Sequence, residues 1–491
     1  MNSAMSTLTP IINLQSQKLY YTGVMLSNPS PTEIVRGINV VIGANSSGKS
    51  TLGNIIEKGW NFRTNAITSP QGKLSVKKIE FSDIHSLSGM KVEYYQQRYE
   101  ATMNDEVPTV AEVMGDKIIT ARWGELTRMF HLTGAEERKI NYLSSGELRK
   151  LLIINALIEP VDVLILDNPY IGLDAQSREI LNEAIDALNL RGITTMLLVA
   201  NPTDIHPHAT QVIPMQNLTI LPPLRDFSSI KWVRQSVMHL FDYAVNIAEI
   251  PLPPVTDNEP VETVMKITNG TVNYGSRRII DGIDWEVKDG QCWGLSGPNG
   301  SGKSTLLSLI CADNPQAYSN DITLFDRRRG SGESIWDIKR RISFVSPEQS
   351  LHFHPAGDVA TIVAQGLNDT TGVFIPLKPG QKELAEQWLR LLHIEHLGPR
   401  SIGTLSGGEK QMVMLARTFI KQPRLMIFDE PLHGLDYARG RAARAIINHF
   451  AARSRASQGK YPLSMIFVSH YVEELPECVT YTKTLGKTPC N

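Results

Sequence analysis

The chain lacks the features that mark several common protein classes. Its four cysteines (Cys292, Cys311, Cys478 and Cys490) form no CxxC pair, which argues against a disulfide framework and against a zinc or iron–sulfur site. Lys plus Arg (49) and Asp plus Glu (50) nearly balance, so the formal net charge is −1. Overall charge therefore favours neither nucleic acid nor an anionic membrane as a partner.

Long apolar segments are also missing from the sequence. No run of about 18 or more uncharged apolar residues occurs, so nothing is expected to span a bilayer. Residues 1–10 are polar and lack the basic and apolar regions of a secretory signal. We expect a soluble, cytoplasmic protein with no transmembrane segment of its own. It would meet a membrane only peripherally, at the inner face of the cell membrane.

The sequence does contain an internal repeat. Four short elements occur twice, in the same order: GANSSGKS at residues 43–50 and GPNGSGKS at 297–304, LSSGE at 143–147 and LSGGE at 405–409, VLILD at 163–167 and LMIFD at 425–429, and GLD at 172–174 and 434–436. The spacing repeats as well, because the serine of the second element and the aspartate of the third are 23 residues apart in both copies (167 − 144 and 429 − 406). The repeat predicts two copies of one domain.

Length and composition agree with two domains. At 491 residues the chain is too long for one hydrophobic core, and 42% hydrophobic with 20% charged residues is typical of globular proteins. We predict a first domain over residues 8–220, a linker over 221–261 and a second domain over 262–491. Within the linker, residues 230–249 have the apolar spacing of a short helix, and a proline-rich acidic stretch follows.

Each GxxxxGK[ST] element has the context of a phosphate-binding loop, because an apolar strand-like run precedes it and a helical pattern follows. Glycines let backbone N–H groups turn toward phosphate oxygens, and the helix N-terminus adds positive charge. The lysine of each loop would reach the β- and γ-phosphates. The predicted nucleotide-binding residues are Gly43, Asn45, Ser47, Gly48, Lys49, Ser50 and Thr51 in the first copy, and Gly297, Asn299, Gly300, Ser301, Gly302, Lys303, Ser304 and Thr305 in the second.

A magnesium ion is expected beside each phosphate loop. Two apolar runs end in Asp167 and Asp429, and an aspartate at the end of such a strand organises Mg²⁺ next to the loop. Ser50 and Ser304 would bind the same ion through their hydroxyl groups. The sequence thus predicts ATP and Mg²⁺ as the ligands of both copies.

The LSxGE element between the phosphate loop and the aspartate strand resembles the signature of ATP-binding-cassette (ABC) ATPases. The resemblance covers nearly the whole chain, apart from the first few residues and the linker. It implies an α/β fold in which each cassette is a P-loop domain with a mainly parallel core sheet and flanking helices. A small antiparallel β part and a helical insert, over residues 109–139 and 357–400, would complete each cassette.

The same resemblance implies that the two cassettes pair head to tail. ATP would lie between the phosphate loop of one cassette and the signature of the other, whose serine and glycine N–H groups reach the γ-phosphate. Ser144 and Gly146 would then complete the site of the second cassette. Ser406 and Gly408 would complete the site of the first.

The resemblance also suggests residues for two further roles in each copy. Tyr274 precedes the second phosphate loop, where an aromatic ring stacks on adenine, and Tyr20 or Tyr21 takes this position in the first copy. The glutamine that senses the γ-phosphate and the metal would be Gln349 in the second copy. In the first copy it would be Gln96 or its neighbour Gln97.

The two copies differ at their catalytic positions. Cassettes that hydrolyse ATP have a glutamate directly after the metal-binding aspartate. The second copy has Glu430 there, whereas the first has Asn168, whose neutral amide cannot accept a proton from water. The histidine expected after the last core strand is His470 in the second copy and is replaced by Asn201 in the first. We predict one hydrolytic site, served by Glu430, His470 and Gln349, and one degenerate site.

The sequence permits three interpretations of what the ATP is used for. Residues 318–339 resemble tandem ABC proteins of molybdenum transport, so one reading is a subunit that energises a separate membrane permease. A soluble ribosome-associated tandem ATPase is the alternative, although the linker is shorter and more proline-rich than the charged helical linkers of those proteins. A third reading is a regulatory ATP sensor that turns over slowly. DNA is not expected as a partner, since zinc-ligand cysteines and coiled-coil insertions are absent.

Overall fold

The computed structural model describes residues 8–59, 67–80, 107–140, 143, 145–225, 227–251, 259–274, 277–298, 300–347, 349, 356–368, 375–421, 423–457, 462–469 and 474–486. The chain divides into two compact units. The first consists of the described residues within 1–90, 107–243 and 436–438, and the second of those within 244–435 and 439–491. The main division thus falls between residues 243 and 244, inside the segment for which a linker is predicted.

The first unit is built on an eight-stranded sheet with a parallel core. Its strands, in spatial order, are β2 (Gln17–Tyr21), β3 (Val24–Asn28), β11 (Thr219–Ile220), β10 (Gln211–Gln216), β5 (Ile38–Ile42), β9 (Thr194–Val199), β8 (Val163–Asp167) and β7 (Val76–Glu80). The last five pair parallel to one another. A second, three-stranded sheet has the order β4 (Thr32–Val35), β1 (Pro10–Leu14) and β6 (Ile67–Thr68).

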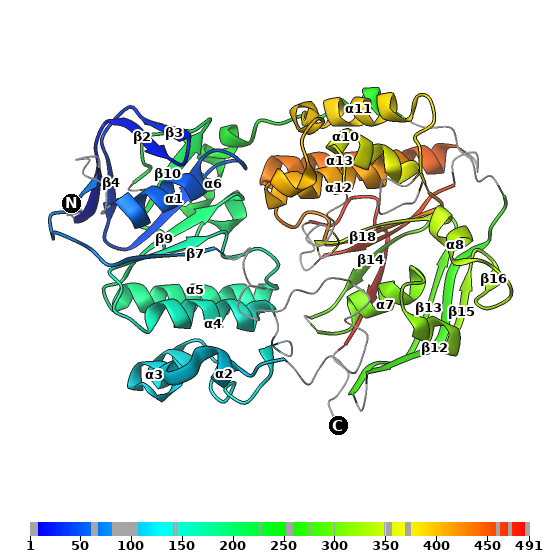
Figure 1. The fold of residues 1–491 in the computed structure, drawn as a ribbon, viewed down its shortest axis with the longest axis horizontal. Helices are drawn as coiled ribbons and strands as arrows, with labels where there is room; N and C mark the ends of the chain where they lie inside the picture. The colour runs from blue at the N-terminus through cyan, green and yellow to red at the C-terminus, as the bar shows by residue number, and fades with distance from the viewer. Residues whose placement is uncertain are drawn as a thin grey trace. The chain divides into compact units, whose positions relative to one another are not determined.

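Helices cover both faces of this sheet (Figure 1). They are α1 (Lys49–Lys58), α4 (Ser145–Leu157) and α5 (Ala175–Leu190). Alternation along the fully buried strand β8 shows why both faces need a cover: Leu164 and Leu166 join one hydrophobic cluster, while Val163 and Ile165 join the other. A strand buried on both sides loses its alternation of polar and apolar residues, which is the pattern of a parallel sheet inside an α/β protein.

The second unit repeats the parallel core and adds an antiparallel sheet. The core strands are β17 (Ile342–Val345), β18 (Leu425–Asp429), β19 (Ser464–Val468), β14 (Cys292–Ser296) and β20 (Tyr481–Thr484), in that spatial order and all parallel. The antiparallel sheet has the order β13 (Arg277–Lys288), β12 (Thr263–Tyr274), β15 (Asp321–Leu324) and β16 (Arg327–Arg328). The helices are α7 (Lys303–Ile310), α8 (Ile335–Arg341), α10 (Val359–Ala364), α11 (Gln381–Leu391), α12 (Gly407–Lys421) and α13 (Tyr437–Ala456).

The two parallel cores have the same topology. The order β7-β8-β9-β5-β10 of the first unit matches β17-β18-β19-β14-β20 of the second, position by position. In both units the phosphate loop follows the fourth of these strands, and the predicted metal-binding aspartate ends the second. The prediction of an α/β fold with two copies of one cassette is confirmed.

Each unit also carries a helical insert. In the first it contains α2 (Val110–Met114) and α3 (Ala121–Met129), and in the second it contains α10 and α11. An isolated bridge joins Thr109 to Lys139, and another joins Asp358 to Ser401, so each insert begins and ends at one place. These helices lie within the ranges 109–139 and 357–400 that were expected for the inserts.

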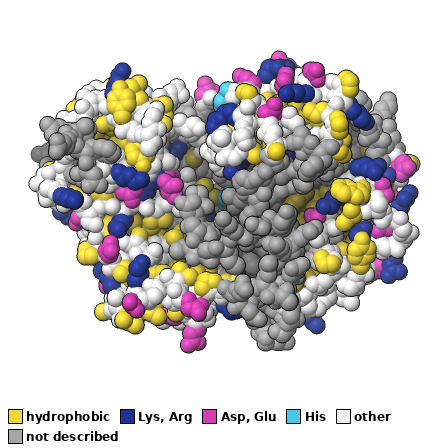
Figure 2. Space-filling model, viewed as in Figure 1, with side chains coloured by type: hydrophobic (Ala, Val, Ile, Leu, Met, Phe, Trp, Pro, Cys, Tyr) yellow, Lys and Arg dark blue, Asp and Glu magenta, His cyan; other side chains and the backbone are white. Residues whose placement is uncertain are grey.

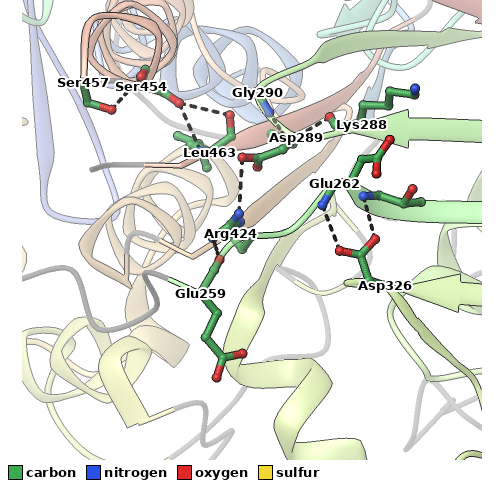
Figure 3. Close-up of polar contacts among 12 residues, drawn as sticks. Glu259, Glu262, Lys288, Asp289, Gly290, Asp326, Arg424, Ser454, Ser457 and Leu463 are labelled. Carbon is green, nitrogen blue, oxygen red and sulfur yellow. Dashed lines mark hydrogen bonds and ion pairs between the residues drawn. The ribbon is translucent and has the colours of Figure 1, made fainter. Parts of the chain in front are cut away.

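A buried arginine ties the antiparallel sheet of the second unit to its parallel core (Figure 3). Arg424 lies just before β18, and its side chain is 2% exposed. Its Nη1 donates to the backbone carbonyl of Glu259 at 2.7 Å, and its Nη2 lies 3.2 Å from Asp289 Oδ2. Nearby, the carboxylate of Asp326 accepts the backbone N–H groups of Glu262 and Thr263, both at 2.8 Å. These bonds fix the start of β12 relative to β18.

The segment after the first domain is only partly helical. An α-helix, α6, covers Ile230–Ser236 and is followed by 3₁₀ turns at Met238–Phe241 and Ile247–Glu249, whereas the apolar spacing predicts helical structure over residues 230–249. Val233, Val237, Leu240 and Phe241 are all buried in the main core of the first unit. In the 3₁₀ turn at Met238–Phe241, the adjacent residues Leu240 and Phe241 both pack into this core.

The described surface carries mixed charge. On the face shown in Figure 2, basic and acidic side chains of the described residues are interspersed, in keeping with the balanced composition. In the described part of the chain, no helix is both long and apolar enough to cross a membrane. Cys292, Cys311 and Cys478 are buried free thiols.

Candidate functional site

The phosphate loops of the two units hold their lysines in the same way. Lys49 Nζ donates to the carbonyls of Gly43 and Ala44, both at 2.8 Å. Lys303 Nζ donates to Gly297 O at 2.8 Å and to Pro298 O at 3.1 Å. Both lysines are buried, so each ammonium group is held at the rim of its own loop. This placement supplies a positive charge where the phosphates of a nucleotide would lie.

Glycine is required where each loop enters its helix. Gly48 (φ +99°) and Gly302 (φ +88°) precede α1 and α7 and adopt left-handed backbone conformations. Gly43 is required for close packing, since a Cβ atom there would lie 2.3 Å from the carbonyl oxygen of Met215. These constraints explain the spacing of glycines in the loop motif. The remaining predicted loop residues (Asn45, Ser47, Ser50, Thr51, Gly300, Ser301, Ser304 and Thr305) lie in these two loops and in the first turns of α1 and α7.

The second unit has an oxygen-rich site beside its loop. Ser304 Oγ donates to Asp429 Oδ2 at 3.0 Å, and the Asp429 residue is 6% exposed. Carboxylate and hydroxyl oxygens are among the ligands that Mg²⁺ prefers. Gln349, which the sequence predicts to sense the metal, follows β17, and its buried Oε1 has no hydrogen-bond partner among the described residues. The residues of the second unit therefore fit the ion that the sequence predicts.

The first unit differs at the corresponding place. Asp167 ends β8 as Asp429 ends β18, and it is equally buried. However, its Oδ2 lies 3.1 Å from the ammonium nitrogen of Lys78, whose side chain is 2% exposed. Sequence reasoning did not single out Lys78, because nothing in the local pattern of β7 distinguishes it from other strand lysines. Ser50 and Asp167 were predicted to bind Mg²⁺. In the structure, the carboxylate of Asp167 instead lies beside the ammonium group of a lysine.

The residues after the two buried aspartates have the same backbone conformation. Asn168 has φ +52° and Glu430 has φ +45°. Their backbone N–H groups donate to Leu198 O at 2.9 Å and to Val468 O at 3.0 Å, respectively. The Asn168 side chain also donates from Nδ2 to Asp167 Oδ1 at 3.2 Å. One structural position therefore carries a carboxylate in the second unit and an amide donor in the first.

Each signature element lies at the start of a helix. Ser406 precedes α12, and its hydroxyl donates to Glu409 Oε2 at 2.7 Å while the same oxygen accepts the Ser406 N–H at 2.8 Å. Gly408 lies in the first turn of α12, and Gly146 is buried near the start of α4. Helix N-termini of this kind present N–H groups to anions.

A second feature that sequence reasoning missed joins the signature helix to the aspartate strand. Arg149 on α4 donates from Nη1 to Pro169 O at 3.4 Å, and Gln411 on α12 donates from Nε2 to Pro431 O at 2.8 Å. Both donors lie five residues after the signature serine, in matching places (149 − 144 and 411 − 406). Their partners directly follow Asn168 and Glu430.

Other predicted residues have mixed outcomes in the structure. Tyr274 ends β12, and its hydroxyl accepts Asn314 Nδ2 at 3.1 Å. Tyr20 is 69% exposed on β2, whereas the Tyr21 hydroxyl accepts Lys58 Nζ at 2.9 Å. The adenine contact predicted for these tyrosines stays a prediction. Four predicted residues, together with the alternative Gln97, lie outside the described residues: Gln96, Ser144, Asn299 and His470.

Comparison with known proteins gives the family. A family model described as ABC transporter matches residues 34–171 and 280–433, one match in each unit. The chain belongs to the ABC transporter family. It is 34% identical over 464 residues to the ABC transporter ATP-binding protein ModF of Escherichia coli, covering 90% of this chain and 89% of ModF. An uncharacterized ABC transporter ATP-binding protein of Schizosaccharomyces pombe is 26% identical over 467 residues, covering 91% of this chain and 92% of the relative.

Solved structures agree on the tandem fold. A ribosome-bound archaeal Pelota and ABCE1 structure matches with a TM-score of 0.61 at 16% identity, covering 94% of this chain and 75% of the other. A structure titled RNase-L Inhibitor matches with a TM-score of 0.54 at 19% identity, covering 91% and 83%. At such identities the likeness shows the fold alone. ABC ATP-binding domains are ATP hydrolases, so this chain is a tandem ABC ATPase, as its sequence predicts.

Proposed function

We propose that this tandem ABC ATPase binds two ATP molecules at composite sites and hydrolyses ATP mainly at the site built on the second cassette. Each site would combine the phosphate loop of one cassette with the signature of the other, as the family resemblance implies. The observation that carries the proposal is the residue after the buried aspartate. Glu430 and Asn168 share one backbone conformation, yet only Glu430 can accept a proton.

The residues of the second cassette have separate tasks in this proposal. Lys303 and the N–H groups at the start of α7 hold the β- and γ-phosphates. Ser304 and Asp429, with Gln349, would hold Mg²⁺, which neutralises charge on the phosphates when bound. Glu430 accepts a proton from the attacking water. His470 contacts the γ-phosphate, and Ser144 and Gly146 complete the site.

The first cassette retains the groups for binding but not those for hydrolysis. Its phosphate loop holds Lys49 as the second loop holds Lys303. Asn168 donates to Asp167, and Asn201, in the place of the histidine, accepts the Thr203 N–H at 3.0 Å. Neither amide can act as a general base. We infer that this site, completed by Ser406 and Gly408, binds ATP and hydrolyses it slowly or not at all.

Steady-state ATPase activity of the Glu430→Gln variant tests the assignment. Loss of a general base typically lowers the rate about 10²–10⁴-fold, so turnover should fall by that amount while two nucleotides per chain still bind. Glutamine is nearly isosteric, which leaves the fold and the phosphate loops unchanged. Turnover near that of the unaltered protein would show that Glu430 is not the base and that the site assignment is wrong.

We propose that the ATPase energises or regulates a transport system, with molybdate as the cargo by resemblance. The chain is similar over most of its length to ModF, an ABC transporter ATP-binding protein, and this similarity supports a role in transport. The partner would be a separate permease subunit docked at the inner face of the membrane. Copurification with a permease from detergent-solubilised membranes would support the proposal. ATP-dependent sedimentation with ribosomes, and no permease, would favour the ribosome-associated alternative.

A further inference from the structure

The ammonium group of Lys78 lies among oxygen atoms beside the phosphate loop of the first cassette. It is 3.1 Å from Asp167 Oδ2 and 2.8 Å from Asn54 Oδ1, and it also pairs with the carboxylate of Glu80. The carbonyl oxygen of Ser50 lies 3.4 Å from the same nitrogen. Two of these residues, Ser50 and Asp167, are the ones expected to hold Mg²⁺. A buried cation of the protein therefore contacts the carboxylate of the aspartate expected to hold the metal and the backbone of the serine beside it.

The second cassette has other residues at the corresponding positions. In the sheet, Lys78 on β7 lies opposite Ile165 of β8, and the matching place on β17, opposite Ile427 of β18, is Phe344. Besides Asp167, two side chains accept from Lys78, and both differ between the copies. Asn54 and Ser308 each lie five residues after the lysine of their phosphate loop, and Glu80 corresponds to Ser346. The lysine and both side-chain acceptors thus occur together in one copy only.

An ammonium group and a divalent ion compete for the same carboxylate at such short range. Both need the carboxylate oxygens of the same aspartate, and the repulsion between like charges is little screened where the side chains are buried. Lysine nonetheless supplies what a nucleotide requires there, a positive charge close to the phosphate oxygens. A lysine ammonium is a compact, strongly charged donor that binds phosphate well. The residues of the first cassette therefore do not fit Mg²⁺ as those of the second do.

We propose that the nucleotide site of the first cassette binds ATP without a divalent metal, and that Lys78 supplies the cation. The ligand is then the metal-free nucleoside triphosphate, whereas the second cassette takes the magnesium complex. The inference rests on the proposed function in one respect, namely that both cassettes bind ATP. It gives the degenerate site a ligand preference of its own and makes its occupancy independent of the magnesium concentration.

Counting metal and nucleotide on the intact chain tests the inference. Mn²⁺ can replace Mg²⁺, and bound Mn²⁺ is counted by electron paramagnetic resonance beside radiolabelled ATP in equilibrium dialysis. With saturating ATP, two nucleotides but one Mn²⁺ should bind per chain. With EDTA, one nucleotide should remain bound, and Lys49→Ala should remove it. Two Mn²⁺ per chain, or release of both nucleotides by EDTA, would overturn the inference.

The Lys78→Met variant sharpens the test, because methionine keeps the length of the side chain and removes its charge. A charged hydrogen-bond donor to phosphate is worth about 10- to 100-fold in affinity, so ATP binding in EDTA should weaken by that factor. Mn²⁺ should restore the affinity, and the count should rise to two per chain. Lys77→Met is the matched control, since the neighbouring lysine is 44% exposed and pairs only with Glu159 in the described residues. It should change neither count.

The test separates this inference from the proposed function. If only one nucleotide binds per chain even with Mn²⁺ and saturating ATP, the proposed two-site function fails. If two nucleotides bind and each brings one Mn²⁺, the proposed function stands and the role of Lys78 is wrong. Should Lys78→Met fail to fold, the metal and nucleotide counts on the unaltered protein still decide between these outcomes.

Discussion

At the scale of single residues, the position after the buried aspartate has a backbone conformation that favours the asparagine of the first copy over the glutamate of the second. Its backbone is in the left-handed region, at φ +52° for Asn168 and φ +45° for Glu430. Asparagine enters this region far more readily than glutamate does. Glu430 is thus held in a strained conformation at the proposed catalytic site, where such strain is common. We therefore expect activity and stability to oppose each other at this residue.

A pair of Glu430 variants tests this opposition. Both Glu430→Gln and Glu430→Asn replace the carboxylate by an amide, and both should lose turnover. Glu430→Asn should be more stable by about 0.5–1 kcal/mol, because only asparagine tolerates a positive φ at little cost. Thermal unfolding with nucleotide absent measures the difference. Equal midpoints for the two variants would show that the backbone at residue 430 is unstrained.

At the scale of elements, the signature helix and the aspartate strand of each cassette are joined by one side chain. Gln411 on α12 donates to the carbonyl of Pro431, and Arg149 on α4 donates to that of Pro169. The carbonyl that Gln411 contacts follows Glu430 directly. Arginine and glutamine can both donate a hydrogen bond to this carbonyl. The two copies therefore make the same contact with different residues. Gln411 thus contacts the loop that carries the proposed base.

Removing the donor in the second cassette should affect both stability and turnover. Gln411→Leu keeps the volume of the side chain and leaves a buried carbonyl with one donor fewer, at a cost of about 1–3 kcal/mol. Turnover should fall because the backbone of Glu430 is held less firmly. Arg149→Gln is the control, since the second cassette already uses glutamine at this place, and its turnover should be unchanged. Unfolding and ATPase assays on both variants measure these effects. Unaltered turnover in Gln411→Leu would mean that the contact does not position Glu430.

At the scale of the whole molecule, the two cassettes share a topology and differ in chemistry. The order of the parallel core strands is the same in both, yet the proposed base and the oxygen site fitted to Mg²⁺ occur only in the second. The first cassette instead has an amide and a lysine at these places. Because each proposed composite site uses both cassettes, we expect ATP at the first site to favour their pairing while the second site turns over.

The Lys49→Ala variant tests this division of roles. Loss of the loop lysine should weaken ATP binding to the first cassette and lower turnover at the second, although every proposed hydrolytic residue is intact. The fall should be smaller than in Glu430→Gln, and higher ATP concentrations should partly reverse it. Steady-state ATPase assays over a range of ATP concentrations measure both effects. Turnover that is independent of Lys49 at all ATP concentrations would show that the sites work separately.

Contiguous motifs let the sequence by itself determine the family, the two-copy α/β fold, both phosphate loops and the difference between Glu430 and Asn168. Each of these features is a short run in which a strand, a loop and a helix follow one another, so local pattern suffices to predict it. The spacing of apolar residues predicted helical structure over residues 230–249, but the α-helix ends at Ser236. Beyond it, the adjacent residues Leu240 and Phe241 are both buried in the core, and tertiary packing of this kind decides where a helix is stable.

Only the tertiary structure decided which distant residues meet. Lys78 and Asp167 are 89 residues apart in the chain (167 − 78) and become neighbours because β7 and β8 pair in parallel. Arg424 likewise meets Glu259 and Asp289, which are more than 100 residues away in the chain (424 − 259 and 424 − 289). A lysine in a strand is common, so the sequence around Lys78 does not mark it as unusual. Its effect on a metal site depends on the carboxylate that the fold brings beside it, and no local pattern records that contact.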